Sequence, residues 1–259
     1  MPNGSGLVLS VVSHGQRGLL LGLLDDLHSQ VKMSFRVIVT ENIPEQPDLP
    51  IARYSYPIVV IKNSHPTGFG ANHNAALQRA GSGLFCVINP DIRLRADPFP
   101  ALLAMVSDPR IGVVTPAVTD PSHAPEDHAR SFPSVFTLVG KLLGYRPKSA
   151  LPEGERVYHP DWIAGMFMLF RTETIRSVDG FDERYYLYYE DVDLCARLRD
   201  LGLDVAVCTD VSVIHAARRE SRRNARFASW HVRSAIRFLV SRPRIALGFK
   251  SRHREAESN

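Results

Sequence analysis

Residues 84–91 read Leu84-Phe85-Cys86-Val87-Ile88-Asn89-Pro90-Asp91, so an unbroken apolar run passes directly into an amide, a proline and a carboxylate. An apolar run of this length is typical of a strand that is buried on both faces of a sheet, and the proline ends it. Asp91 is therefore expected just beyond the carboxyl end of a buried strand. The alternative is that Asn89-Pro90-Asp91 forms a simple Asx-type turn leaving the strand.

Strand and helix patterns alternate on both sides of this segment. Further strands are predicted at 7–12, 35–40, 57–62, 111–118 and 205–208, and helices at 18–27, 70–80, 172–178, 191–201 and 225–239. Residues 161–170 return to the core, whereas residues 119–160 lack periodicity and are expected to form a long loop or lid with a short helix at 135–143.

This alternation predicts an α/β fold with a mostly parallel central sheet flanked by helices. Ligands of such sheets bind beyond the carboxyl ends of the strands. The polar residues that follow the predicted strands are expected to meet at that edge: Ser13, Glu41, Asn63 and Asp91.

The composition fits a folded globular protein. The chain has 259 residues, 44% of them hydrophobic, which is enough for a sizeable core. No apolar run is long enough to span a bilayer, and the first residues lack a secretory pattern, so a cytoplasmic location is expected. Cys86, Cys195 and Cys208 lack metal-site spacing and are predicted to be buried thiols.

The segment after His215 is rich in arginine, although the formal net charge of the chain is only +4. Residues 225–239 have the pattern of a basic amphipathic helix, for which an anionic membrane surface is a suitable partner. A solvated helix or a contact within a homodimer is the alternative. A nucleic acid is not expected, because no binding motif is present and the acids around Glu190 would repel phosphates.

Carboxylates cluster at the predicted start of a helix in Tyr188-Tyr189-Glu190-Asp191-Val192-Asp193-Leu194-Cys195. The helix dipole favours acids there whatever the function. The aromatic and acidic residues 180–186 just before it favour a functional site, with a general base for a hydroxyl nucleophile as the obvious role. Asp191 and Glu190 are the candidate catalytic residues.

Two further motifs are weaker when taken alone. His215 follows the apolar residues 211–214, and a neutral imidazole is a suitable ligand for Mn²⁺, although a lone histidine at a strand end is more often structural. Gly70 and Asn72 lie at a loop-to-helix junction, where backbone N–H groups meet phosphate or ribose in many proteins. An ordinary helix start also explains this junction.

In their order along the chain, these motifs resemble the inverting GT-A-fold glycosyltransferases of family 2, over nearly the whole chain to about residue 240. The resemblance is carried by Val11-Val12-Ser13-His14-Gly15, Gly68-Phe69-Gly70-Ala71-Asn72, Asn89-Pro90-Asp91, Asp161-Trp162-Ile163-Ala164-Gly165, Gly180-Phe181-Asp182-Glu183, Glu190-Asp191-Val192-Asp193-Leu194-Cys195 and His215. The chain is most similar to bacterial O-antigen L-rhamnosyltransferases at Val12-Ser13-His14-Gly15, Arg130-Ser131-Phe132-Pro133, Trp230-His231 and Arg237-Phe238-Leu239.

The resemblance implies a GT-A domain at 1–215, with a nucleotide-sugar half at about 1–118 and an acceptor half at about 119–215, followed by the basic tail 216–259. It implies a divalent cation, Mg²⁺ or Mn²⁺, held by Asp91 and His215. Asp191 matches the catalytic base, with Glu190 beside it. The implied donor residues are Ser13, Glu41, Asn63, Gly70, Asn72, Asn89 and Asp91, and the implied acceptor residues are Trp162, Gly165 and Asp193.

The implied reaction moves L-rhamnose from TDP-L-rhamnose to a polyprenyl-diphosphate-linked saccharide at the inner face of the cell membrane, in the synthesis of O-antigen or another surface polysaccharide. The second strand departs from the family, since it ends in Thr40-Glu41-Asn42 where the family normally has Asp-Asn. A UDP-sugar donor therefore stays open. Asn89 replaces the first acid of a full DxD motif, so partial metal dependence is expected. A nucleotidyltransferase of similar fold is a further alternative, although no Gly-rich phosphate loop is found.

Overall fold

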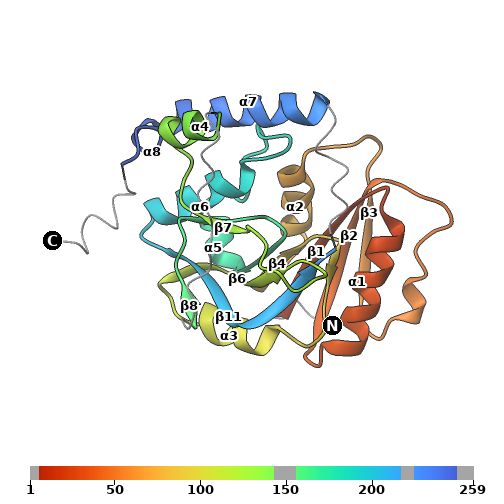
Figure 1. The fold of residues 1–259 in the computed structure, drawn as a ribbon. Helices are drawn as coiled ribbons and strands as arrows, with labels where there is room; N and C mark the ends of the chain where they lie inside the picture. Colours follow the sequence, from red (N-terminus) through yellow and green to blue (C-terminus); the bar gives the residue numbers. More distant parts are fainter. Residues whose placement is uncertain (1–5, 143–155, 217–224, 250–259) are drawn as a thin grey trace.

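The computed structural model describes residues 6–142, 156–216 and 225–249. One large sheet runs through the molecule with helices on both of its faces (Figure 1). Its strands follow the order β3-β2-β1-β4-β10-β6-β11-β5, and β8 pairs with β11 outside this path. The predicted α/β architecture with a mostly parallel sheet is confirmed.

The first half of the sheet is wholly parallel, because β1 pairs with β2 and β4, and β2 pairs with β3, all in the same direction. Residue 13 pairs with residue 41 at the carboxyl ends of β1 and β2. The elements of this half are β1 (Gly6–His14), α1 (Arg17–Gln30), β2 (Phe35–Ile43), the 3-10 helix η1 (Ile51–Arg53), β3 (Ile58–Lys62), α2 (Phe69–Gln78) and β4 (Gly83–Ile88).

The second half is mixed, because β10 runs antiparallel to both β4 and β6 while β11 runs parallel to β6. A separate two-stranded ribbon is formed by β7 and β9. The elements are β5 (Ile92–Arg93), α3 (Phe99–Val106), β6 (Ile111–Thr119), β7 (Ala129–Arg130), α4 (Val135–Leu142), β8 (Val157–Tyr158), β9 (Trp162–Ile163), β10 (Phe167–Arg171), α5 (Thr172–Ser177), α6 (Glu190–Asp200) and β11 (Asp204–His215).

Two hydrophobic clusters lie on the two faces of the sheet, because successive side chains of a strand point in opposite directions. Leu9 of β1 belongs to the cluster that contains the leucines of α1 and Phe99 of α3. Val8, its neighbour, belongs to the cluster that contains residues of α2, α5 and α6, such as Leu194. The burial of both faces explains the continuous apolar strands in the sequence.

A third hydrophobic cluster joins α6 to α7 (Ala225–Ser241) and α8 (Pro243–Ala246). Phe238 of α7 is fully buried in it and lies 5.7 Å, between ring centroids, from Tyr189. The basic amphipathic helix predicted at 225–239 is therefore present and packs against α6. Among the described residues, no helix is both long enough and apolar enough to cross a bilayer.

Several sequence-based expectations were wrong or incomplete. Helix α3 was not predicted, since it is short and almost wholly apolar and shows no helical alternation. The short helix predicted at 135–143 is confirmed as α4, but the described part of residues 119–160 also contains the strands β7 and β8 and is therefore not otherwise a loop. These two-residue strands depend on partners distant in sequence, which local patterns cannot reveal. Residues 161–170 form two strands, β9 and β10, and the last strand extends to His215. The three cysteines are free and buried, as predicted.

Candidate active site

The carboxyl ends of the first three parallel strands carry a network of asparagine side chains. Asn63 Nδ2 donates to Asn42 Oδ1 at 2.9 Å and to Asn72 Oδ1 at 2.7 Å. Asn72 Nδ2 in turn donates to the Gly68 carbonyl at 2.9 Å. The predicted residues Asn63 and Asn72 are therefore brought together. The centre of the network is Asn42, whose Oδ1 also accepts a hydrogen bond from the Thr67 backbone N–H at 2.8 Å.

Glu41 and Ser13 lie side by side at the same edge and are both buried. Arg17 Nη2 lies 3.6 Å from Glu41 Oε1, while Glu41 Oε2 is buried without a hydrogen-bond partner among the described residues. Ser13 Oγ accepts a hydrogen bond from the Gln16 backbone N–H at 3.3 Å. An unpartnered buried carboxylate oxygen is costly, so this oxygen is the group at this edge best placed for a ligand donor.

The glycines at the start of α2 are explained by close packing. A Cβ on Gly70 would lie 2.7 Å from Phe181 Cβ, and one on Gly68 would lie 2.8 Å from the Tyr186 carbonyl oxygen. The Phe69 N–H already donates to that carbonyl at 3.0 Å. These contacts give Gly70 a packing function that is separate from its predicted donor contact.

The turn after β4 places Asp91 beside His215, the last residue of β11. The Asn89 backbone carbonyl accepts the Ile92 N–H at 3.2 Å, so the chain leaves β4 through a β-turn closed by the backbone. His215 Nε2 lies 3.3 Å from Asp91 Oδ2, and His215 Nδ1 lies 3.0 Å from Glu126 Oε2. Burial lowers the pKa of His215, but the hydrogen bonds and charges of Asp91 and Glu126 outweigh it and hold this pKa above its ordinary value.

The pair Asp91 and His215 has the donor atoms that a divalent cation accepts. Asp91 Oδ1 is buried without a hydrogen-bond partner among the described residues. A carboxylate oxygen and an imidazole nitrogen suit Mg²⁺ or Mn²⁺, which usually complete their coordination with phosphate and water oxygens. The described part of the chain has no group of three or more His, Cys, Asp or Glu side chains arranged to hold a metal ion. A cation bound here would complete its coordination with phosphate or water oxygens.

Asp191 lies in the first turn of α6 and is held by backbone donors on both carboxylate oxygens. The Gly165 N–H donates to Oδ2 at 3.0 Å, and the Val192 N–H donates to Oδ1 at 2.8 Å. Burial raises the pKa of Asp191, and these two hydrogen bonds lower it in part. A Cβ on Gly165 would lie 3.1 Å from the Phe69 ring and 3.7 Å from Asp191 Cβ, so the glycine permits this approach.

Glu190 is buried next to Asp191, but it lacks the two backbone N–H donors that hold Asp191. Its Oε2 has no hydrogen-bond partner among the described residues. Burial raises the pKa of Glu190 well above its ordinary value, and the Asp191 charge raises it further. Two neighbouring buried carboxylates do not both ionise readily. When only one of the two acids is ionised, we therefore assign the negative charge to Asp191 and the proton to Glu190.

The two tyrosines before these acids have an unusual backbone conformation. Tyr188 and Tyr189 have φ values of 70° and 69°, in the left-handed region that favours glycine. Non-glycine residues held there cost of order 1–3 kcal/mol each and persist only where the surroundings fix them. His231 of α7 lies 5.3 Å from the Tyr188 ring and 5.4 Å from the Tyr189 ring, between centroids. Helix α7 therefore braces the segment that presents the catalytic acids.

Trp162 lies in the β7–β9 ribbon, half-buried beside Arg130. The Arg130 guanidinium lies 5.6 Å from the Trp162 ring centroid, and Trp162 Nε1 donates to the Ser131 carbonyl at 3.0 Å. The positive charge of Arg130 acts on Asp191, whose pKa it lowers slightly against the larger effect of burial. Trp162, Gly165 and Asp191 thus come from neighbouring segments, as an acceptor site requires.

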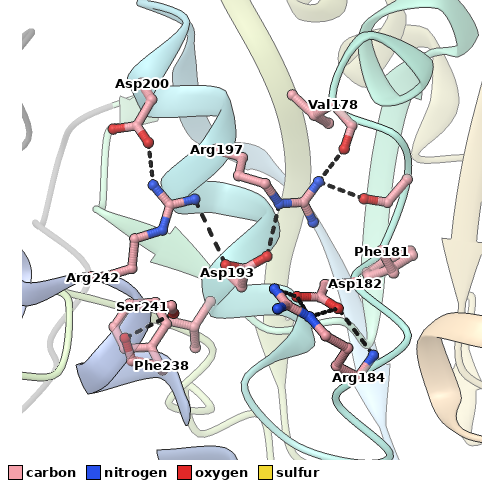
Figure 2. Close-up of polar contacts among 12 residues, drawn as sticks. Val178, Phe181, Asp182, Arg184, Asp193, Arg197, Asp200, Phe238, Ser241 and Arg242 are labelled. Carbon is pink, nitrogen blue, oxygen red and sulfur yellow. Dashed lines mark hydrogen bonds and ion pairs between the residues drawn. The ribbon is translucent and has the colours of Figure 1, made fainter.

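The Asp193 carboxylate faces two arginines. It lies 2.7 Å from Arg197 Nε and 3.7 Å from Arg242 Nη2 (Figure 2). Arg242 precedes α8 and also pairs with Asp200 at the end of α6. Both carboxylate oxygens of Asp193 thus face arginines that fasten α6 to its surroundings. These ion pairs give Asp193 a positioning role, and its predicted acceptor contact stays a prediction.

Two residues of the site had no assigned role in the sequence reasoning. Glu126 comes from the segment 119–160 and reaches His215 across 89 positions of sequence, so no local pattern marks it. Asn42 adjoins Glu41 in the second strand, and only the three-dimensional network shows its central place.

Comparison with known proteins agrees with this geometry. The family described as "Glycosyltransferase like family 2" matches residues 7–233. Rhamnosyltransferase WbbL of Escherichia coli K12 is 29% identical over 244 residues, which cover 89% of this chain and 91% of that protein. N-acetylglucosaminyl-diphospho-decaprenol L-rhamnosyltransferase of Mycobacterium tuberculosis H37Rv is 32% identical over 167 residues, covering 60% of this chain and 54% of that protein.

Solved structures share the fold at low identity. GalNAc-T7 with UDP, GalNAc and Mn²⁺ has a TM-score of 0.68 and 13% identity, over 92% of this chain and 48% of that one. The mannosyltransferase PcManGT of Pyrobaculum calidifontis, with GDP-Man and Mn²⁺, has a TM-score of 0.60 and 17% identity, over 89% and 64% of the two chains. These likenesses show the GT-A fold. Since the family match spans most of the sequence, the chain belongs to glycosyltransferase family 2 and is a glycosyltransferase.

Proposed function

We propose that this enzyme transfers L-rhamnose from TDP-L-rhamnose to a hydroxyl group of a lipid-linked saccharide, with inversion at the anomeric carbon. The observation that carries the proposal is the half-buried Asp191 carboxylate, held by Gly165 and Val192 beside Trp162. The rhamnosyl donor is supported by two relatives named as rhamnosyltransferases. A nucleotidyltransferase is no longer favoured, because the family match covers residues 7–233.

In the proposed reaction, Asp191 accepts the proton of the acceptor hydroxyl. The hydroxyl oxygen forms a bond to the anomeric carbon while the bond from that carbon to the diphosphate oxygen breaks. The bonding electrons leave with the nucleoside diphosphate. A positioned base contributes typically about 10²- to 10⁴-fold to such a rate. The remaining acceleration comes from alignment of donor and acceptor and from stabilisation of the leaving group.

Asp91 and His215 are the residues that would hold a divalent cation, with the diphosphate oxygens and water as further ligands. When bound, such a cation neutralises the charge of the departing diphosphate. The proposal is supported by the unpartnered Asp91 Oδ1 and by the Mn²⁺ in two structures of the same fold. Asn89, in place of an acid, leaves one carboxylate here, so partial dependence on the cation is expected.

Glu41, Ser13, Asn63 and Asn72 are proposed to bind the nucleoside of the donor. The free oxygen of Glu41 would accept a hydrogen bond from the base or ribose. A UDP-sugar is the second candidate donor, because GalNAc-T7 and Staphylococcus aureus TarS, which share the fold, were solved with UDP and UDP-GlcNAc respectively. TarS has a TM-score of 0.61 and 16% identity, over 90% of this chain and 66% of that one.

The acceptor is proposed to be a polyprenyl-diphosphate-linked saccharide at the inner face of the cell membrane, as in O-antigen synthesis. The mycobacterial relative supports this class, since its name specifies a sugar linked to decaprenol through a diphosphate. Such an acceptor places the reaction at a membrane surface.

A donor screen tests the proposal. Purified enzyme with Mg²⁺ or Mn²⁺ is offered TDP-, UDP- and GDP-sugars, and donor-dependent thermal stabilisation and slow donor hydrolysis are measured. Stabilisation and hydrolysis with TDP-L-rhamnose alone are expected. A response to a UDP-sugar alone would overturn the donor and keep the mechanism. If no donor stabilised the enzyme or was hydrolysed, that result would contradict a nucleotide site at Glu41 and Asp91.

A further inference from the structure

Exposed apolar side chains are concentrated on three helices. Of the eleven large hydrophobic residues that are exposed in the described part of the chain, seven belong to α4, α7 or the end of α8. Their exposed fractions range from 43% to 76%. We call them the α4–α7–α8 face: Val135, Phe136, Val232, Ile236, Val240, Leu247 and Phe249.

The three helices form one side of the molecule. Figure 1 shows α7 lying along one edge with α4 and α8 at the same end. A Cβ on Gly248 would lie 3.9 Å from Phe136 Cδ2, so the end of α8 meets α4. On α7, Val232, Ile236 and Val240 are spaced by four residues and share one side of the helix. The exposed apolar side chains are thus gathered on one side of the molecule.

The charge of this region has one sign. The sequence contains no Asp or Glu between Glu220 and Glu255. Arg226, Arg233 and Arg237 of α7 and Arg244 of α8 are exposed. Arg233 and Arg237 each directly follow a residue of the apolar stripe. An apolar stripe flanked by arginines is the pattern of a helix that lies in the interface of an anionic bilayer.

We propose that the α4–α7–α8 face docks on a membrane containing anionic phospholipid, with its apolar side chains among the acyl chains and its arginines at the headgroups. This proposal rests on the proposed function in one respect, namely that the acceptor is lipid-linked. A second copy of the chain fits less well, because two-fold pairing would bring two arginine-rich faces together. The membrane supplies both the apolar phase and the opposite charge.

The same helix connects this face to the catalytic acids. The inner side of α7 contacts the segment just before Glu190: the Trp230 ring lies 4.7 Å from the Tyr186 ring, between centroids, and Ser234 Oγ donates to the Leu187 carbonyl at 3.0 Å. A docked α7 therefore holds the base next to the lipid surface. The reducing-end diphosphate of a lipid-linked acceptor stays at the headgroups while its sugar reaches Asp191.

The first arm of the test is vesicle flotation of the full chain without substrates. The vesicles contain phosphatidylcholine alone or mixed with phosphatidylglycerol. The triple variant Phe136→Ser, Ile236→Ser, Val240→Ser is expected to lower binding to the mixed vesicles by about tenfold or more, since three apolar side chains no longer insert. The matched control is Ile51→Ser with Val59→Ser, which removes exposed apolar residues at the opposite edge of the sheet and is expected to bind as wild type.

The second arm examines charge. Arg233→Gln with Arg244→Gln is expected to remove most of the preference for phosphatidylglycerol over phosphatidylcholine, and binding by wild type is expected to fall with salt. Arg156→Gln, which changes an arginine that is 86% exposed outside this face, serves as the control. Thermal melting checks that each variant is folded. All substituted side chains are exposed, so melting temperatures near that of wild type are expected.

Several outcomes would overturn the docking face. The first is that wild type fails to float with anionic vesicles, and the second is that the triple variant floats as well as wild type. The third is that wild type binds no vesicles but self-associates, and the triple variant does not. That result would assign the face to a second copy of the chain. A water-soluble acceptor with a short lipid separates the two proposals. Transfer to it without vesicle binding contradicts only the docking face, whereas vesicle binding without any transfer contradicts only the proposed function.

Discussion

The Gly165 backbone N–H donates to Asp191 Oδ2 at 3.0 Å and thereby ties the turn between β9 and β10 to the start of α6. This bond fixes the carboxylate at the N-terminal end of a helix, where the dipole favours a negative charge. It does so without neutralising the carboxylate, as an arginine would. Asp191 therefore keeps its basicity while its position is fixed.

Asp191→Asn is expected to reduce kcat by about 10²- to 10⁴-fold, because the amide retains the shape of the side chain but cannot take the proton. Single-turnover transfer and donor binding by calorimetry measure the two effects separately. Donor affinity is expected to stay at the wild-type level. Turnover equal to that of wild type would contradict the assignment of the base.

Glu190→Gln is expected to retain kcat within about tenfold, because glutamine resembles the protonated acid that burial favours at this position. The test compares kcat of Glu190→Gln with kcat of Asp191→Asn, both measured by steady-state kinetics. If both variants were equally inactive, Glu190 would have a direct part in proton transfer.

The rate of transfer is expected to fall at acidic pH earlier than for an ordinary aspartate. Burial raises the pKa of Asp191, and the base acts only when ionised. As pH falls through this raised pKa, the ionised fraction falls and kcat falls with it. In a pH–rate profile, this acidic limb is expected at a higher pH than the usual pKa of aspartate, which is about 3.9.

The same profile for Glu190→Gln tests which acid holds the proton. Because Glu190 is assigned as neutral, its replacement by a neutral amide should leave the acidic limb in place. A limb displaced to lower pH would show that Glu190 carries a charge in the native enzyme.

Asp91→Asn is expected to raise the Mn²⁺ concentration for half-maximal rate by roughly tenfold or more, since an amide oxygen is a weaker ligand than a carboxylate. Titration of chelator-treated enzyme with Mn²⁺ measures the change, with melting temperature as the check on folding. An unchanged titration curve would place the cation away from Asp91.

Arg242→Met is expected to destabilise the fold by about 1–3 kcal/mol, because it leaves the buried Asp193 with one arginine in place of two. Thermal or urea unfolding measures the change. Asp200→Asn removes only the exposed partner of Arg242 and is expected to cost less. An equal loss in both variants would show that the contact with Asp193 adds nothing.

The sheet and its ligand-binding edge could be predicted from the sequence because buried parallel strands have a recognisable local pattern of apolar residues. The apolar runs that end at Ser13, Glu41 and Ile88 are readable without any partner. Contacts between distant segments leave no such pattern. Glu126 reaches His215, and Arg242 reaches Asp193, only because the sheet and α7 bring them together. The positioning role of Asp193 could not be predicted for that reason, since its place in an acidic motif does not reveal the arginines opposite.

The left-handed tyrosines also set an order in time. Tyr188 and Tyr189 are synthesised well before His231 and Phe238, the residues that brace them. Because chains fold from the N-terminal side as they emerge, a nascent sheet with its nucleotide edge complete still lacks the brace for its catalytic acids. We therefore expect the growing polypeptide to complete its proposed donor site first and to fix its candidate catalytic acids only after α7 has left the ribosome.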